Sequence, residues 1–233
     1  MIPKVIHYCW FGGKPLPADV KACIRSWKKL CPEYEIRRWD ESNFDVNAHP
    51  FMKAAYEAKA WAFVSDYARL QVVYENGGIY LDTDVELKKS LDAFLQHPCY
   101  LAVQQADAQV ATGLGFGAQK GNAVIGKMLR SYDDIPFDPE NRDAMACPLL
   151  NTRMLAQMGY VPGPSVQTVE DAVIYPPRYF DPVAPGHQDI TCKDTVSVHH
   201  YSATWVTGLR YWKRKLARSI GDKWIIRLKG LLK

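Results

Sequence analysis

The chain has 233 residues, of which 48% are hydrophobic and 23% are charged, a composition typical of a globular domain with a substantial core. No stretch approaches the roughly 20 apolar residues that a membrane-spanning helix needs, and the first residues, MIPKVIHYCWFGG, lack a signal-peptide core. The six cysteines are scattered and form no C-x-x-C pair, so we expect a reduced protein in the cytoplasm.

Charge divides the chain into two parts. Residues 208–233 hold nine lysines or arginines and one acid, Asp222, which gives this segment a charge of +8. Because the whole chain carries +4, residues 1–207 carry −4. We therefore predict a boundary at residue 207. The domain before it, residues 1–207, is predicted to be α/β from the patterns described next, and residues 208–233 form a strongly basic tail.

The first half of the domain alternates between strand and helix patterns. Residues 4–11 predict a strand that Gly12-Gly13 ends, and such a strand opens a mononucleotide-binding unit. Residues 17–30 predict a helix, because their apolar residues recur at three- and four-residue spacing. A second strand is predicted over residues 34–39 and a second helix over residues 50–61.

Residues 62–86 form the most informative stretch of the chain. Their first part, through Glu75, predicts a helix from apolar residues at positions 63, 67, 70, 73 and 74. Gly77-Gly78 is a good C-cap, because glycine adopts a left-handed backbone at little cost. Ile79-Tyr80-Leu81 is expected to leave as a short buried strand.

Two acids follow that strand directly. If the strand geometry persists, Asp82 and Asp84 point to the same face, at the sheet edge where open α/β sheets bind ligands. Two like charges held this close need a cation, a proton or a donor between them, and aspartate oxygens suit Mg²⁺ or Mn²⁺. On the preceding helix, Asp66 and Arg69 share one face and could address a polyhydroxyl ligand. The alternative for Asp82 and Asp84 is a solvated turn, and the alternative for Asp66 and Arg69 is a surface ion pair.

The second half of the domain gives weaker signals. A strand is predicted over residues 100–103, and helices over residues 124–132 and 142–158, the latter interrupted at Cys147-Pro148. Gly113-Leu114-Gly115-Phe116-Gly117 has the wrong spacing for a dinucleotide-binding fingerprint. Residues 195–205 predict a strand whose inward face carries Val196, Val198 and, at its end, His200.

The tail has the pattern of a basic amphipathic helix. Apolar residues, including Trp212 and Trp224, recur every three or four positions among the lysines and arginines. This pattern is typical of a helix that lies in an anionic membrane interface. The alternative is a helix packed on the domain with solvated charges, and we expect no nucleic-acid partner.

Residues 65–69, SDYAR, together with residues 77–85, GGIYLDTDV, resemble the signature of the DXD-containing sugar-binding glycosyltransferases. That family includes bacterial capsular polysaccharide and lipopolysaccharide enzymes and yeast-type mannosyltransferases, and it is akin to the glucosylating domains of large clostridial toxins. The resemblance implies a GT-A fold, a Rossmann-like mixed sheet flanked by helices. It also implies a nucleotide-sugar donor, a divalent metal and retention of the anomeric configuration.

The resemblance further implies roles for the residues of the donor site. Trp10 corresponds to an aromatic residue that contacts the nucleobase, and Gly12 lets the backbone come close. Asp66 and Arg69 would hold the hydroxyls of the donor sugar. Asp82 would contact the donor and, with Asp84, the metal.

A second match lies near the end of the domain, where the family shows H-H-x-x-x-S-W. Residues 199–205, HHYSATW, fit with threonine in place of serine. The resemblance implies that His200, of the two histidines, helps to hold the metal or the diphosphate, and that Trp205 closes over the diphosphate. At residues 146–148 the chain has A-C-P where relatives often show T-G-P, so no contact is carried over there.

The sequence therefore predicts a metal-dependent, retaining glycosyltransferase that uses a nucleotide sugar, with a UDP-sugar favoured. Its acceptor is expected to be a saccharide or a lipid-linked saccharide in the synthesis of a bacterial surface polysaccharide such as capsule or O-antigen, at the inner face of the cytoplasmic membrane. Two alternatives stay open. One is a haloacid-dehalogenase-type phosphotransferase that uses the D-x-D aspartate, and the other is a membrane-docked sugar-binding protein without activity.

Overall fold

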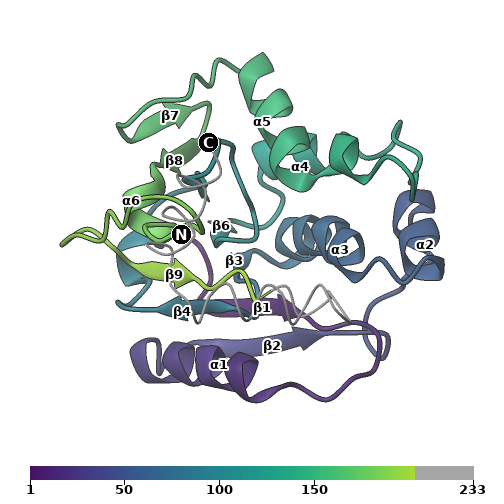
Figure 1. The fold of residues 1–233 in the computed structure, drawn as a ribbon, viewed down its shortest axis with the longest axis horizontal. Coiled ribbons are helices and arrows are strands. Elements are labelled where there is room, and N and C mark those ends of the chain that lie inside the picture. The colour runs from purple at the N-terminus through teal and green to yellow at the C-terminus, as the bar shows by residue number, and fades with distance from the viewer. Residues whose placement is uncertain (203–233) are drawn as a thin grey trace, which may run out of the picture.

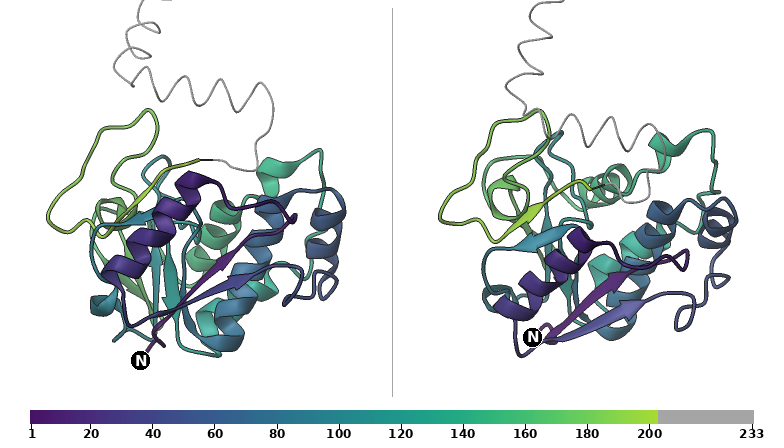
Figure 2. Two further views of the ribbon diagram at one scale, coloured as in Figure 1. Left: turned by 90° about the horizontal axis from the view of Figure 1, so that it is seen from below. Right: turned by 60° about the horizontal axis from the view of Figure 1, so that its bottom comes forward.

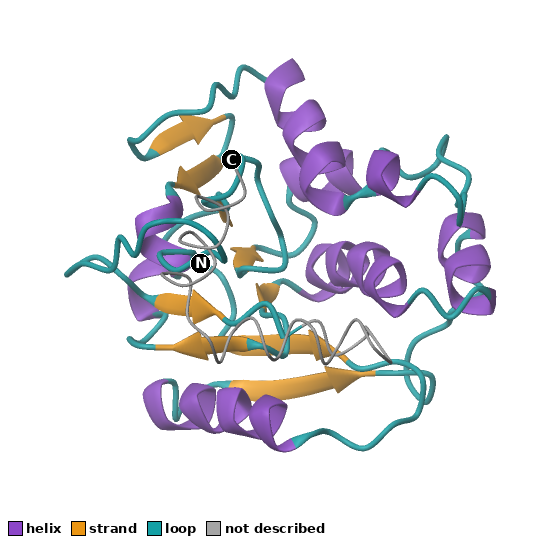
Figure 3. Ribbon diagram, viewed as in Figure 1, coloured by secondary structure: helices purple, strands orange, loops and turns teal. Residues whose placement is uncertain are grey.

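The structure, a computed structural model, describes residues 1–202 of the chain. These residues form a mixed seven-stranded sheet with helices on both faces (Figure 1, Figure 3). In spatial order the strands are β2 (Glu35–Trp39), β1 (Val5–Cys9), β3 (Gly78–Tyr80), β6 (Phe116–Ala118), β5 (Cys99–Ala102), β8 (Ala172–Tyr175) and β7 (Gln167–Val169). The predicted α/β class, with a mixed sheet between helices, is confirmed.

Strand direction changes at β6, near the middle of the sheet. β1 pairs in parallel with β2 and β3, and β5 pairs in parallel with β8, whereas β6 is antiparallel to both of its neighbours. β7 closes one edge as an antiparallel partner of β8. A separate antiparallel ladder joins β4 (Val85–Leu87) to β9 (Ser197–His199). This ladder brings the last described residues back to the segment that follows Asp84.

Six α-helices and two 3-10 turns are present in the described part of the chain. Their bounds are α1 (Ala18–Leu30), α2 (Pro50–Glu57), α3 (Trp61–Asn76), α4 (Ala123–Arg130), α5 (Cys147–Gln157) and α6 (Pro177–Phe180), with the 3-10 turns η1 (Asp92–Phe94) and η2 (Arg142–Met145). The predicted helix that begins at Pro50 is present, but it ends at Glu57 and not at residue 61, because Lys59 adopts a left-handed backbone with φ of 53° between α2 and α3. The predicted interruption near Cys147-Pro148 is confirmed, and Pro148 lies in the first turn of α5, where its missing N–H costs little.

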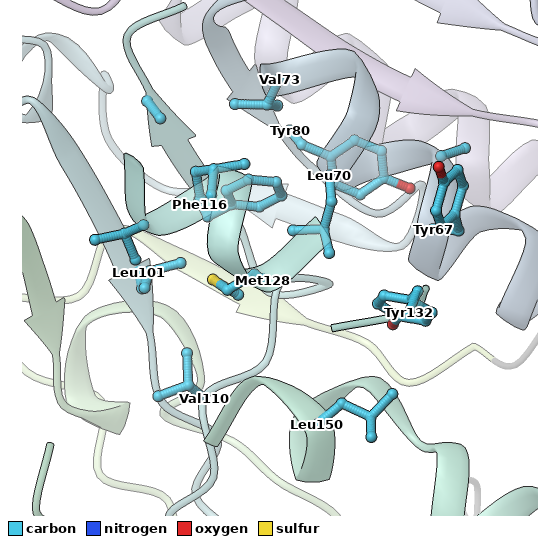
Figure 4. Close-up of a cluster of buried hydrophobic side chains, with 14 of the residues drawn as sticks. Tyr67, Leu70, Val73, Tyr80, Leu101, Val110, Phe116, Met128, Tyr132 and Leu150 are labelled. Carbon is cyan, nitrogen blue, oxygen red and sulfur yellow. The ribbon is translucent and has the colours of Figure 1, made fainter. Parts of the chain in front are cut away.

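Two hydrophobic cores cover the two faces of the sheet, and alternate residues of each strand enter different cores. Tyr80 and Leu101 face the core formed with α2, α3, α4 and α5, part of which Figure 4 shows. Ile79 and Tyr100 face the other core, formed with α1, β4 and α6. Figure 2 shows α1 on the side of the sheet opposite to α3. Central strands buried on both faces have no polar side, which explains their continuous apolar sequence.

The end of helix α3 is fixed by glycine and by a buried histidine. Gly77 has a φ of 68°, and its N–H donates to the carbonyl of Val73, as the predicted C-cap requires. The Nε2 of His7, on β1, donates to the carbonyl oxygen of Gly77 over 2.8 Å. A Cβ on Gly78 would lie 2.7 Å from that nitrogen, so only glycine fits there. The chain thereby leaves α3 and enters β3 directly beside β1.

Within residues 1–202, no helix is both long and apolar enough to cross a bilayer. The predicted basic helix over residues 208–233, the boundary at residue 207 and the predicted diphosphate contact of Trp205 lie outside the described residues.

Candidate active site

A cavity of about 600 Å³ opens at the carboxyl ends of three central strands. Trp10 follows β1, Asp82 follows β3 and Gln104 follows β5, and all three side chains line the cavity. Ligands of open α/β sheets bind at this edge, and the volume suits a small organic ligand. The cavity also contains Asp66, Arg69 and Asp84, so the structure brings the two predicted pairs together in one place.

The two acids of the D-x-D motif come together through a turn and not through a continued strand. β3 ends at Tyr80, and the N–H of Val85 donates to the carbonyl of Asp82 over 3.0 Å. The expectation of strand geometry through residue 84 is therefore wrong, because hydrogen bonds to the segments beside β3 end with the N–H of Asp82, and a turn occupies residues 83 and 84. Even so, ligand atoms of Asp82, Asp84 and His199 lie within 4.8 Å of one another.

Asp84 is a carboxylate held by β9 and by the residues that follow it. Its Oδ1 lies 3.0 Å from Nε2 of His199, and its Oδ2 accepts the backbone N–H of Ser202 over 2.7 Å. Burial alone would raise the pKa of Asp84, but His199 and these hydrogen bonds lower it to about 2. Asp84 therefore stays ionised at neutral pH, as a metal ligand must be.

His199, and not His200, is the histidine beside the acids. In the β4–β9 ladder Val85 lies opposite His199, and Leu87 lies opposite Ser197, so these four residues share one face. His200 leaves toward the surface, where its Nε2 lies 3.0 Å from Glu86 and 43% of its side chain is exposed. The prediction took Val196, Val198 and His200 as the inward face. Val196, which precedes β9, is buried as predicted, but within β9 the pairing with β4 places His199 beside the acids and His200 at the surface, opposite to the predicted phase.

Arg69 links the two predicted motifs. Its Nη2 donates to Oδ1 of Asp66 over 3.0 Å and to Oδ1 of Asp82 over 3.1 Å, and its Nε donates to the carbonyl of Ser65. Burial would lower the pKa of Arg69, but Asp82 and its other neighbours keep it above the ordinary value. The guanidinium therefore stays charged with only 5% of its side chain exposed. The alternative of a surface ion pair is excluded.

The acids around Arg69 are less acidic than usual. Burial raises the pKa of Asp66 to about 6, although Arg69 opposes the shift. Burial also raises the pKa of Asp82, again against the effect of Arg69. The hydroxyl of Tyr80 donates to Oδ1 of Asp82 over 3.0 Å, so this oxygen already accepts two bonds. A further cation near Asp82 would favour its ionised form.

The first strand supplies the aromatic end of the cavity. Trp10 lines the cavity, and its Nε1 donates to the carbonyl of Lys14 over 2.6 Å, which fixes the ring. Gly12 has a φ of 89°, and a Cβ there would lie 2.9 Å from the indole of Trp61. Gly12 itself does not line the cavity. Its role in the structure is to let Trp61 form part of the cavity wall.

Several cavity residues were missed by the sequence reasoning. Trp61, Cys147 and Tyr201 line the cavity, and the ring of Tyr201 packs against that of His199 in a tilted arrangement, with centroids 4.2 Å apart. Tyr201 falls within the H-H-x-x-x-S-W match, so its position next to His199 was a usable signal. Cys147 lies at the first residue of α5, in the segment where the chain departs from its relatives, and no local pattern marks it.

The chemistry of this donor set fits a hard divalent cation. Two carboxylates and one imidazole lie close together, and the Nδ1 of His199 is buried without a hydrogen-bond partner among the described residues. Oxygen ligands with one imidazole suit Mn²⁺ and Mg²⁺, which keep further positions for water and phosphate. The residues that would hold such an ion are Asp82, Asp84 and His199.

Comparison with known proteins identifies the family of this region. Residues 17–101 match the family described as "Glycosyltransferase sugar-binding region containing DXD motif". The chain is 28% identical over 141 residues to inositol phosphoceramide mannosyltransferase 3 of Schizosaccharomyces pombe, covering 59% of this chain and 39% of that protein. It is 32% identical over 101 residues to an uncharacterized glycosyltransferase of Acanthamoeba polyphaga mimivirus, covering 41% of this chain and 40% of that protein. The chain thus spans about two-fifths of the length of these relatives.

A solved structure supports the fold over a larger part of the chain. The PaToxG glycosyltransferase superposes with a TM-score of 0.55 at 22% identity, covering 67% of this chain and 68% of that one. This similarity establishes the architecture and confirms the predicted GT-A fold. The resemblance predicted from S-D-x-x-R and D-x-D is confirmed as well: the chain carries the DXD-containing sugar-binding region of the glycosyltransferases on a GT-A fold.

Proposed function

We propose that the chain is a metal-dependent glycosyltransferase that transfers a sugar from a nucleotide-sugar donor with retention of configuration. The observation that carries the proposal is one cavity that contains the acid pair with His199, the Asp66–Arg69 pair and Trp10. These groups match the three parts of such a donor, which are its diphosphate, its sugar and its base.

Each group has a defined task in this proposal. Asp82, Asp84 and His199 hold the cation, which when bound neutralises the charge that develops on the leaving diphosphate. Asp66 accepts hydrogen bonds from sugar hydroxyls, and Arg69 keeps Asp66 and Asp82 in place through its two ion pairs. The Trp10 ring offers a face for the nucleobase. A UDP-sugar is the donor that we favour.

We propose a saccharide or a lipid-linked saccharide as the acceptor, in the synthesis of a surface polysaccharide. Support for a lipid-linked acceptor comes from the relative named for mannosyl transfer to inositol phosphoceramide. The basic segment 208–233 is consistent with an acceptor presented at an anionic membrane surface.

The surroundings of Asp82 weigh against the phosphotransferase alternative. A nucleophilic aspartate needs an oxygen free to attack a phosphoryl group, whereas Oδ1 of Asp82 accepts bonds from Arg69 and Tyr80. Its other oxygen lies against Gly113. A trapped aspartyl-phosphate would nevertheless select that alternative. A sugar-binding protein without activity would bind donor but release no nucleoside diphosphate.

A donor screen tests the proposal. The protein is incubated with Mn²⁺ and each of UDP-Glc, UDP-Gal, UDP-GlcNAc, UDP-GalNAc and GDP-Man, and thermal stabilisation and slow donor hydrolysis are followed. We expect one donor to give a metal-dependent response. Asp84→Asn should lower the hydrolysis rate about 100-fold or more, because it removes a charged metal ligand.

Asp45→Asn is the matched control, because Asp45 is exposed and lies outside the cavity. It should behave as the wild type. Full activity of Asp84→Asn, or the absence of any response that needs both metal and donor, would overturn the proposed function.

A further inference from the structure

The glycine run at residues 113–117, which fits no dinucleotide-binding motif, lies directly alongside the strand that leads to the D-x-D acids. Gly117 pairs with Ile79, and Phe116 pairs with Tyr80, in the β3–β6 ladder (Figure 1). The contact continues beyond the ladder, because the N–H of Asp82 donates to the carbonyl of Gly113 over 3.2 Å. The run therefore accompanies the chain up to the first acid of the motif.

Gly113 lies directly against Asp82, the first acid of the D-x-D motif. A Cβ built on Gly113 would lie 2.3 Å from Oδ2 of Asp82 and 3.1 Å from Nη1 of Arg69. The backbone of Gly113 is not left-handed, unlike that of Gly115 with a φ of 125°. Conformational freedom is thus not the reason for glycine at position 113. The reason is the space that the carboxylate of Asp82 occupies.

This space decides where the carboxylate of Asp82 lies. Its Oδ1 accepts bonds from Arg69 and from Tyr80, while its Oδ2 occupies the space beside Gly113. A methyl group at position 113 would force the carboxylate to rotate, or would push the 113 turn away. Either movement shifts Asp82 relative to Asp84 and His199.

We propose that Gly113 is a positioning residue, whose missing side chain sets the orientation of Asp82 in the acid pair. The consequence for metal and donor rests on the proposed function, whereas the steric coupling between residues 113 and 82 does not. The coupling can therefore be measured without metal, donor or turnover.

A double-mutant cycle in metal-free protein tests the coupling. Gly113→Ala should lower the melting temperature of the full chain by about 3–10 °C, the usual effect of overpacking. In the Asp82→Ala background the same change should cost less than about 2 °C, because the clashing carboxylate is gone. If Asp82→Ala does not fold, Asp82→Ser serves as the second background.

Gly115→Ala is the comparison, because its Cβ would lie 2.9 Å from Leu81 and its backbone is left-handed. Gly115→Ala should lower the melting temperature by the same amount in the wild-type and in the Asp82→Ala background. Equal costs of Gly113→Ala with and without the Asp82 side chain would overturn the positioning role.

A second readout connects the coupling to the site. In Mn²⁺ titrations followed by thermal stabilisation, with UDP present, Gly113→Ala should weaken apparent Mn²⁺ affinity at least about tenfold. Gly163→Ala, whose added methyl meets only the far end of Gln167 and a carbonyl at 3.4 Å or more, should leave it unchanged. If the wild type itself shows no Mn²⁺ response, the proposed function fails while the metal-free cycle still decides the role of Gly113. Unchanged Mn²⁺ affinity in Gly113→Ala, with a wild type that does respond, would contradict the inference.

Discussion

At the scale of single residues, the two adjacent histidines have opposite environments. Only 14% of the His199 side chain is exposed, and it contacts Asp84, whereas His200 lies at the surface beside Glu86. Burial would lower the pKa of His199, but the neighbouring Asp84 carboxylate outweighs it and raises the pKa. The pair therefore offers an internal comparison with nearly the same sequence context.

His199→Ala should weaken the apparent affinity for Mn²⁺ by about 10- to 100-fold, because it removes an imidazole from the donor set and a bond from Asp84. His200→Ala should change that affinity less than about threefold, because its side chain points away from the acids. Isothermal titration of Mn²⁺ in the presence of UDP measures both. A larger loss in His200→Ala than in His199→Ala would contradict the assignment and restore the original prediction.

The acids and the arginine were predictable from the sequence, but the histidine was not. Asp66 and Arg69 are three positions apart on a strongly periodic helix, so their shared face follows from helix geometry. Asp82 and Asp84 are adjacent to a glycine-ended helix and an apolar strand. The phase of a three-residue strand such as β9 depends on pairing with β4, more than 110 positions earlier, which no local pattern records.

At the scale of secondary-structure elements, one buried side chain joins three of them. His7 lies on β1, its Nε2 donates to the carbonyl of Gly77 at the end of α3, and its Nδ1 accepts the indole N–H of Trp39 on β2. This pattern fixes the neutral tautomer with the proton on Nε2. Burial lowers the pKa of His7 to about 4, and its protonation would place a proton against the Trp39 donor.

Because the pKa of His7 is lowered in the folded protein, we expect the free energy of unfolding to fall as the pH falls. The unfolded chain has a histidine pKa near 6.5, so between pH 6.5 and pH 4 the unfolded state binds more protons than the folded state. The contribution of neutral, buried His7 to the free energy of unfolding is therefore complete above about pH 6.5 and is lost as the pH falls toward 4. From pH 7 to pH 4.5 the contribution of His7 should fall by about 2 kcal/mol.

Urea unfolding of the wild type and of His7→Gln at both pH values measures this contribution, because glutamine does not titrate. The wild type should lose about 2 kcal/mol more than the variant between pH 7 and pH 4.5. If the difference in free energy of unfolding between the wild type and His7→Gln is the same at both pH values, His7 is not buried in its neutral form.

The helices and strands themselves were partly predictable. Helices α1 and α3 have apolar residues at regular spacing, and the structure has them within one or two residues of the predicted bounds. The β4–β9 ladder was not predicted, because β4 has only three residues after a turn and no local pattern identifies the strand with which it pairs. Residues 195–205 were predicted as one strand, and of the described residues in that range, 195–202, only Ser197–His199 pair. Strand length here is set by the partner and not by β-propensity.

At the scale of the whole molecule, the order of the strands creates the site. β1, β3 and β5 end at the same edge of the sheet, so residues 10, 82 and 104 meet although they are far apart in sequence. A mononucleotide-binding first strand and the D-x-D signature were enough to predict this architecture. The return of β9 to the site depends on its long-range pairing with β4, which explains why the place of Tyr201 in the cavity wall was not predicted.

The charge of the molecule is concentrated at its C-terminal end, and we expect this end to bind anionic membranes. Residues 208–233, outside the described part, carry +8 against −4 for the domain, and each basic residue near an anionic bilayer is worth about 1 kcal/mol. Deleting these residues should leave the Mn²⁺-dependent donor response unchanged and lower binding to vesicles that contain anionic lipid. Sedimentation with neutral and with phosphatidylserine-containing vesicles measures this. Replacing Lys213, Arg214 and Lys215 with glutamine keeps the apolar residues and should give an intermediate loss. Equal partition of the full and shortened chains would exclude the tail as the membrane contact, whereas loss of the donor response on deletion would show that it belongs to the active site.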